Sequence, residues 1–108
     1  MPVDPESEVP EGAAVFPLIP EDLGVHPLLL AVLHATVFLQ GSEESVVDPE
    51  AGAEALEYFA TYLQRLQADE LRRVSEDLQC LVTYARQNRW PKEQVRFLKE
   101  FLSDFGIG

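Results

Sequence analysis

The chain has 108 residues, of which 46% are hydrophobic, and its 19 acidic and eight basic side chains give a formal net charge of −11. This length is typical of one domain with its own core and is too short for two. So large a negative charge repels nucleic acid and anionic lipid surfaces and attracts basic partners. We therefore expect neither nucleic acid nor a membrane as a partner.

The charge is unevenly distributed along the chain. Residues 1–64 carry twelve acidic side chains and no Lys or Arg, whereas all eight basic residues lie at position 65 or beyond. The chain has one cysteine, Cys80, which cannot form an internal disulfide. Nothing in this composition requires an oxidising compartment, so we expect a cytoplasmic protein.

Residues 1–22, "MPVDPESEVPEGAAVFPLIPED", hold five of the eight prolines and six acidic residues. This composition disfavours regular structure and predicts an extended arm. Within it, "AAVFPLIP" is apolar enough to dock in a groove, either on its own domain or on a partner. Residues 23–108 are predicted to form a single helical domain.

The stretch "HPLLLAVLHATVFLQG" has no formal charge from His26 to Gly41. It falls short of the roughly 20 apolar residues that span a bilayer, and an acidic segment precedes it where a signal peptide would be basic. Pro27 suits the first position of a helix and Gly41 the residue after its end. A helix over about 27–40 would be apolar on every face, which predicts that the other helices surround it. The β-branched residues of the run also suit a strand, which is the alternative.

Three more helices follow in the pattern. The second is expected over about 49–67, with Asp48 as its cap and Pro49 at its first position. The third covers about 70–88 with Asp69 as a possible cap, either after a tight helical hairpin or as a kinked continuation of the second. The last helix is expected to begin near Pro91 and to end before Gly106. The predicted fold is therefore an all-α, compact bundle of four helices around the buried helix at 27–40.

Catalytic and metal-binding motifs are not found. His26 and His34 are eight residues apart and so do not share a helix face, and the chain lacks a Cys pair and an HExxH motif. Adjacent acidic residues at predicted helix starts are typical of caps. We expect no enzyme activity, catalytic residue, metal or cofactor. The less favoured alternative is a small hydrolase or metal-dependent enzyme that uses His34 with acidic residues.

Aromatic and Arg side chains outside the predicted core suggest where a protein partner would bind, because these residue types anchor interfaces. In the other interpretation the aromatic residues pack beneath the acidic arm. The candidate interaction surface consists of Tyr58, Arg73, Tyr84, Arg86, Arg89 and Trp90.

The sequence as a whole favours a small, acidic, cytoplasmic protein–protein interaction module that binds a basic partner or itself, with a homodimer and a monomer equally open. In size, acidity and helix content the chain resembles small bacterial nuclease inhibitors, although no motif carries the resemblance. It implies an alternative function, that of an immunity-like inhibitor of a basic enzyme.

Overall fold

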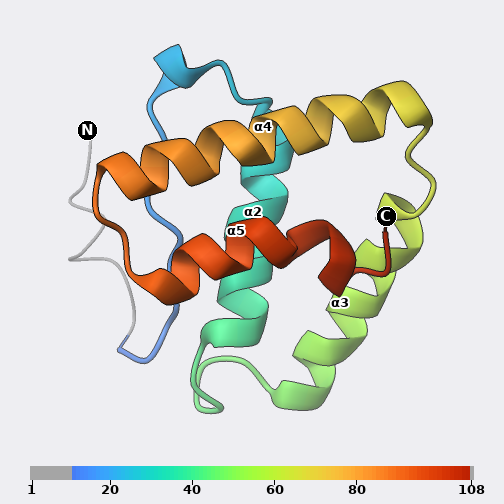
Figure 1. Ribbon diagram of the computed structural model, residues 1–108. Coiled ribbons are helices and arrows are strands. Elements are labelled where there is room, and N and C mark those ends of the chain that lie inside the picture. Colours follow the sequence, from blue (N-terminus) through green and yellow to red (C-terminus); the bar gives the residue numbers. More distant parts are fainter. Residues whose placement is uncertain (1–10, 108) are drawn as a thin grey trace.

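The structure is a computed structural model in which residues 11–107 are described. These residues form an all-α bundle of four helices, as predicted, and they include no strand. A short 3-10 helix precedes the four (Figure 1). The elements in chain order are η1 (Glu21–Leu23), α2 (Pro27–Gly41), α3 (Pro49–Leu63), α4 (Ala68–Gln87) and α5 (Lys92–Asp104).

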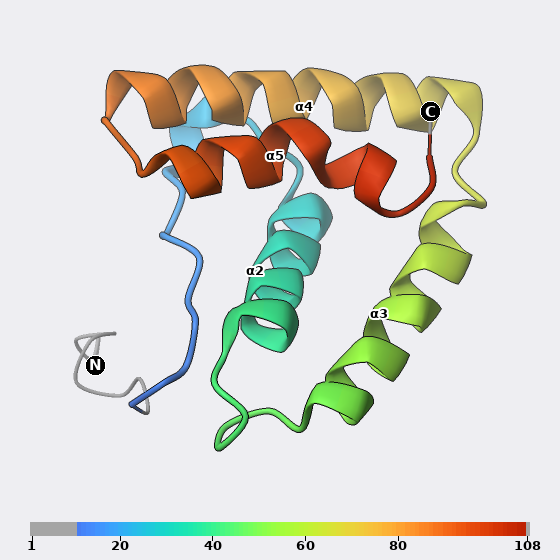
Figure 2. The same cartoon turned by 60° about the horizontal axis from the view of Figure 1, so that its bottom comes forward.

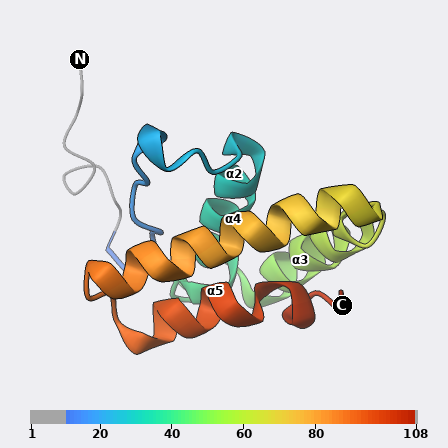
Figure 3. The same cartoon turned by 45° about the horizontal axis from the view of Figure 1, so that its top comes forward.

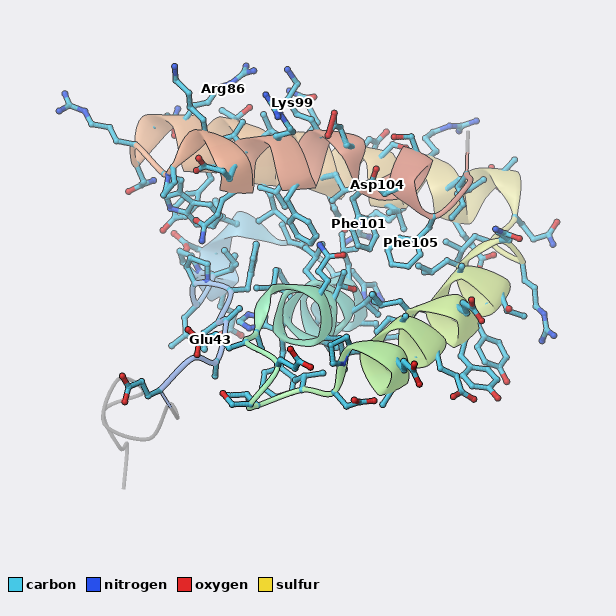
Figure 4. All side chains as sticks on the ribbon, turned by 90° about the horizontal axis from the view of Figure 1, so that it is seen from below. Glu43, Arg86, Lys99, Phe101, Asp104 and Phe105 are labelled. Carbon is cyan, nitrogen blue, oxygen red and sulfur yellow. The ribbon has the colours of Figure 1, made fainter. Side chains whose placement is uncertain are left out.

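The helices are arranged in two layers. Helix α4 packs along α5 in one layer, and α2 packs with α3 in the other (Figure 2). Phe101 of α5 is buried and points from the first layer toward the second (Figure 4). No helix of residues 11–107 is long and apolar enough to cross a membrane.

Helix α2 begins as the sequence indicates. Pro27 takes the first turn, and the ring nitrogen Nδ1 of His26 accepts a hydrogen bond from the Leu28 N–H at 3.1 Å. The helix buries Leu29, Leu33 and Thr36. Leu28 and Phe38 are exposed, however, so part of this apolar helix faces solvent.

Helices α3 and α4 are separate. Asp48 caps α3 as predicted, with its carboxylate accepting from the Ala51 N–H at 3.0 Å. The prediction that Asp69 caps α4 is wrong: the cap is Gln67, whose backbone N–H donates to the Glu70 carboxylate at 2.8 Å. Gln67 is extended, and this places its N–H within reach of the third residue of the helix.

The predicted tight hairpin between α3 and α4 is not formed. The two helices diverge from a shared corner, because α3 packs against α2 whereas α4 packs against α5 (Figure 2). Consequently α3 contributes little to the centre of the molecule, and Gly52 is its one buried residue. The core comes from the other segments, with Phe16, Val25, Leu29, Leu33, Leu78, Leu81, Val82, Ala85, Leu98 and Phe101 as its buried members.

Residues 11–20, the described part of the predicted arm, contain no helix. Phe16 is only 1% exposed and lies in the core. The Ala14 N–H donates to Ser42 Oγ at 2.9 Å, and the Gly12 carbonyl accepts from the Glu43 N–H at 2.8 Å. This segment therefore packs on its own helices. The rest of the arm prediction, residues 1–10, lies outside the described residues, and the division into 1–22 and 23–108 stays a prediction.

Candidate partner-binding groove

The six residues predicted to form one interaction surface lie in three separate places. Tyr58 is exposed on α3. Arg73 lies near the start of α4, whereas Tyr84, Arg86, Arg89 and Trp90 lie at its other end. Arg73 and Arg86 are thirteen residues apart on α4, which is about 20 Å along a helix axis. Arg73 and Tyr58 therefore do not share a patch with the other four.

Tyr84 and Trp90 close the end of α4. The Trp90 N–H donates to the Ala85 carbonyl at 2.9 Å and the Arg89 N–H to the Arg86 carbonyl at 3.2 Å, which is the hydrogen-bond pattern of a Schellman motif. The Tyr84 and Trp90 rings meet edge to face at 5.9 Å between centroids, in the position of the apolar contact that accompanies this motif. Trp90 also meets Phe16 at 5.5 Å. Both aromatic side chains are thus used within the fold.

Arg73 is held by an internal contact. Its Nε donates to the carboxylate of Asp77 at 3.1 Å, and its Nη2 donates to the Gly24 carbonyl at 3.2 Å. Asp77 is buried and also accepts from the His26 N–H at 3.1 Å. Through these bonds the start of α2 is fixed to α4.

Beside this contact lies an apolar groove of about 420 Å³. It is formed where the start of α2 faces the corner between α3 and α4 (Figure 3). Leu28 lies at its edge and is 71% exposed. The apolar side chains that line the groove are Leu28, Leu29, Val32, Leu63, Leu66 and Val74.

The rim of the groove is acidic. Asp69, Glu70 and Asp77 contribute carboxylates and Arg73 the one full positive charge, so the lining has a formal net charge of −2 with His26 neutral. Because Asp77 is paired with Arg73, the two exposed carboxylates of Asp69 and Glu70 determine the charge that a partner meets. Asp69 has a weak ion pair with Arg72 at 4.0 Å, in which both side chains are largely exposed.

Leu63, Leu66 and Val74 recur at helical spacing in the sequence, as residues that face a core do, and all three are half-buried. The apolar side chains of α3 end with that helix at Leu63, and α4 runs in a different direction after the corner (Figure 2). Among residues 11–107, the groove is the space left between the two. The five-residue spacing from Leu66 to Leu71 was the available signal, because it breaks the helical period at this corner.

His34 and Cys80 each contact another part of the fold. His34 lies edge-on against Phe16 with ring centroids 5.1 Å apart, and burial lowers its pKa from 6.5. The Cys80 thiol lies 3.9 Å from the Leu23 carbonyl and is half-buried. Within residues 11–107 no three His, Cys, Asp or Glu side chains are grouped so that they could hold a metal ion.

Comparison of the chain with protein-family models, with curated proteins and with solved structures found no match.

Proposed function

We propose that the protein is an interaction module that binds a basic amphipathic helix of a partner protein in the groove between α2 and the α3–α4 corner. The observation that carries the proposal is the combination of a continuous apolar lining, an exposed Leu28 at its edge and carboxylates on its rim. Contiguous apolar surface with a polar rim is typical of protein interaction sites, whereas single exposed apolar residues are ordinary.

The apolar lining accounts for affinity. An amphipathic helix that lies in a groove buries residues spaced three, four and seven positions apart. Burial of a Leu side chain contributes about 1.5–3 kcal/mol before the cost of ordering the partner is subtracted. Leu28 and Val32 lie one turn apart on α2 and would contact such a helix from one side, and Leu63 and Leu66 from the other.

The charge accounts for the choice of partner. Asp69 and Glu70 on the rim, within a chain of formal net charge −11, favour Lys and Arg on the flanks of the bound helix. Long-range attraction of this kind raises the association rate and weakens as salt is added. The proposal also places the protein in the cytoplasm, in keeping with its single cysteine.

The test uses an 18-residue synthetic helix of Leu and Lys in amphipathic order, and a second peptide in which every Lys is Glu. Titration into ¹⁵N-labelled protein should shift the amides of α2 and of the α3–α4 corner with the Lys peptide and leave them unchanged with the Glu peptide. Binding should weaken at least tenfold between 50 and 300 mM NaCl, a change expected from several charge contacts.

Two matched variants separate the groove from general attraction to an acidic surface. Leu28→Asp should weaken binding of the Lys peptide at least tenfold, because it places a charge in the apolar contact. Leu18→Asp, at a residue that is 76% exposed and outside the groove lining, should leave binding within twofold. Equal loss in both variants, or shifts confined to other helices, would contradict the proposal. So would a dimer in light scattering that Leu28→Asp dissociates, since the groove would then be occupied by a second copy.

A further inference from the structure

A second cavity, of about 500 Å³, lies on the outer side of the α4–α5 layer, away from the groove. Figure 4 shows two of its residues, Arg86 of α4 and Lys99 of α5, projecting together from this side, opposite to Phe101. Five basic side chains and one acidic side chain line the cavity: Arg86, Arg89, Lys92, Arg96, Lys99 and Glu100. We name this set the basic cavity.

The basic cavity reverses the charge of the molecule locally. It collects five of the eight basic residues and has a formal net charge of +4, in a chain of net charge −11. The ion pairs found in the part of the chain that the structure describes involve Arg72 and Arg73, and neither lines this cavity. Within residues 11–107, therefore, the five cations have no carboxylate within 4.0 Å.

The positions of these residues follow from the two helices. Lys92, Arg96 and Lys99 are spaced four and three residues apart, so they share one face of α5. Arg86 comes from the last turn of α4, and Arg89 follows that helix. The lone tryptophan of the chain, Trp90, also lines the cavity.

The backbone at Arg89 is an independent observation. Arg89 has a φ of +55° and occupies the left-handed position of the Schellman motif that ends α4. Helix α5 ends in the same motif, with the Ile107 N–H bonded to the Leu102 carbonyl, and there the left-handed residue is Gly106. Glycine takes this conformation without the steric cost that an arginine meets. The chain therefore holds a guanidinium at the cavity at a position where glycine would avoid this steric cost.

We propose that the basic cavity binds a small polyanion that carries two or more phosphate groups. A terminal phosphate group has a charge of about −1.5 to −2 near pH 7, so a ligand with two such groups matches the +4 of the lining and a ligand with one does not. One Arg guanidinium can donate two parallel hydrogen bonds to a phosphate group, and a Lys ammonium adds a point charge. The rest of the molecule, with twelve acidic and no basic residues in 1–64, repels a long polyanion or an anionic membrane, which favours a compact ligand.

Inorganic tripolyphosphate is the probe, and the fluorescence of Trp90 and calorimetry are the readouts. We expect saturable binding at 150 mM NaCl, with sulfate at equal ionic strength at least tenfold weaker. The double variant Arg86→Gln/Lys99→Gln should weaken binding at least tenfold. Arg72→Gln, an exposed cation elsewhere on α4, should stay within twofold.

Arg89→Gly gives the sharpest test, because it should raise Tm without ligand and weaken tripolyphosphate binding at least fivefold. Absence of binding at millimolar tripolyphosphate, equal binding of sulfate, or equal losses in the Arg72 and Arg86/Lys99 variants would overturn the proposal. A 12-nucleotide single-stranded DNA that binds more tightly than tripolyphosphate would also overturn it, since the site would then serve a polymer.

Discussion

His34 is a half-buried imidazole that meets the ring of Phe16, and burial lowers its pKa from 6.5. In the unfolded chain the same side chain titrates near its ordinary value. As pH falls through about 6.5, the unfolded state therefore binds a proton that the folded state does not. The free energy of unfolding consequently decreases from about pH 6.5 down to the folded pKa, and above that range His34 has no effect on the pH dependence.

His34→Gln removes this titration. We expect the Tm of the variant, relative to that of the unaltered protein, to be higher at pH 5.0 than at pH 7.5. The comparison between the two proteins cancels the response of the acidic residues that they share. A difference in Tm that is independent of pH would contradict the lowered pKa of His34.

The role of a residue could be predicted from the sequence where adjacent residues determine it, but not where it depends on the conformation of a turn. Asp48 and Pro49 were identified as a helix start because cap and proline are adjacent. Aromatic character alone makes Tyr84 and Trp90 candidates for an interface, whereas in the structure their rings make the apolar contact of a Schellman motif. The usual signal for that motif is glycine in the left-handed position, and Arg89 stands there instead. Because no glycine marks the motif, the contact between the Tyr84 and Trp90 rings could not be predicted from the sequence.

At the scale of elements, the segment over 11–20 acts as part of the core although it has no regular structure. The Phe16 ring lies against His34, Trp90 and Phe97, with centroid distances of 5.1, 5.5 and 6.2 Å. These contacts bring residues from α2, from α5 and from the loop after α4 around one side chain. Close packing continues at Gly41, where an added Cβ would lie 2.9 Å from the Cβ of Ala14.

Phe16→Ala should lower the free energy of unfolding by about 3–5 kcal/mol, the range for removal of a buried phenylalanine. Urea denaturation followed by circular dichroism would measure it. Leu18→Ala, two residues away and exposed, is the matched control and should change stability by less than about 0.5 kcal/mol. A loss below about 1 kcal/mol in Phe16→Ala would show that the segment does not belong to the core.

The existence of the four helices followed from periodicity and from the prolines at their starts, but their packing did not. Helix α3 is amphipathic in sequence, and the apolar side chains Leu56, Phe59 and Leu63 are only half-buried because the chain turns at the corner from 64 to 67 and α4 does not pack along α3. That corner depends on the extended backbone of Gln67, which no glycine or proline marks. The groove exists because of this turn, so it could not be inferred from the separate stripes.

At the scale of the whole molecule, two regions of opposite charge character lie apart along α4, whose first turn contributes Asp69 and Glu70 to the groove and whose last turn contributes Arg86 to the basic cavity. The rim of the groove has a formal net charge of −2, and the basic cavity one of +4. The acidic excess of the chain lies mainly in residues 1–64, which carry no Lys or Arg. A partner helix and a polyanion would therefore approach different faces, and binding of one need not compete with the other.

The same imbalance predicts how salt affects stability. Both ion pairs found within residues 11–107 lie on α4, so screening removes little favourable attraction, while it weakens repulsion among 19 acidic side chains. We expect Tm to rise by about 4 °C between 10 and 200 mM NaCl, which corresponds to a gain of about 1 kcal/mol for a domain of this size.

Glu54→Lys tests the cause of that rise, because Glu54 is exposed on α3 with Glu50 one turn before it and Glu57 three residues after it. The new lysine would attract both carboxylates, and a Glu that precedes a Lys by four residues is the more favourable order. At 10 mM NaCl the variant should melt at a higher temperature than the unaltered protein, and the difference should shrink at 200 mM. A difference in Tm that persists at high salt would point to helix propensity instead of charge. In that case Glu54→Gln, which removes one charge without adding another, should raise Tm as much as Glu54→Lys does.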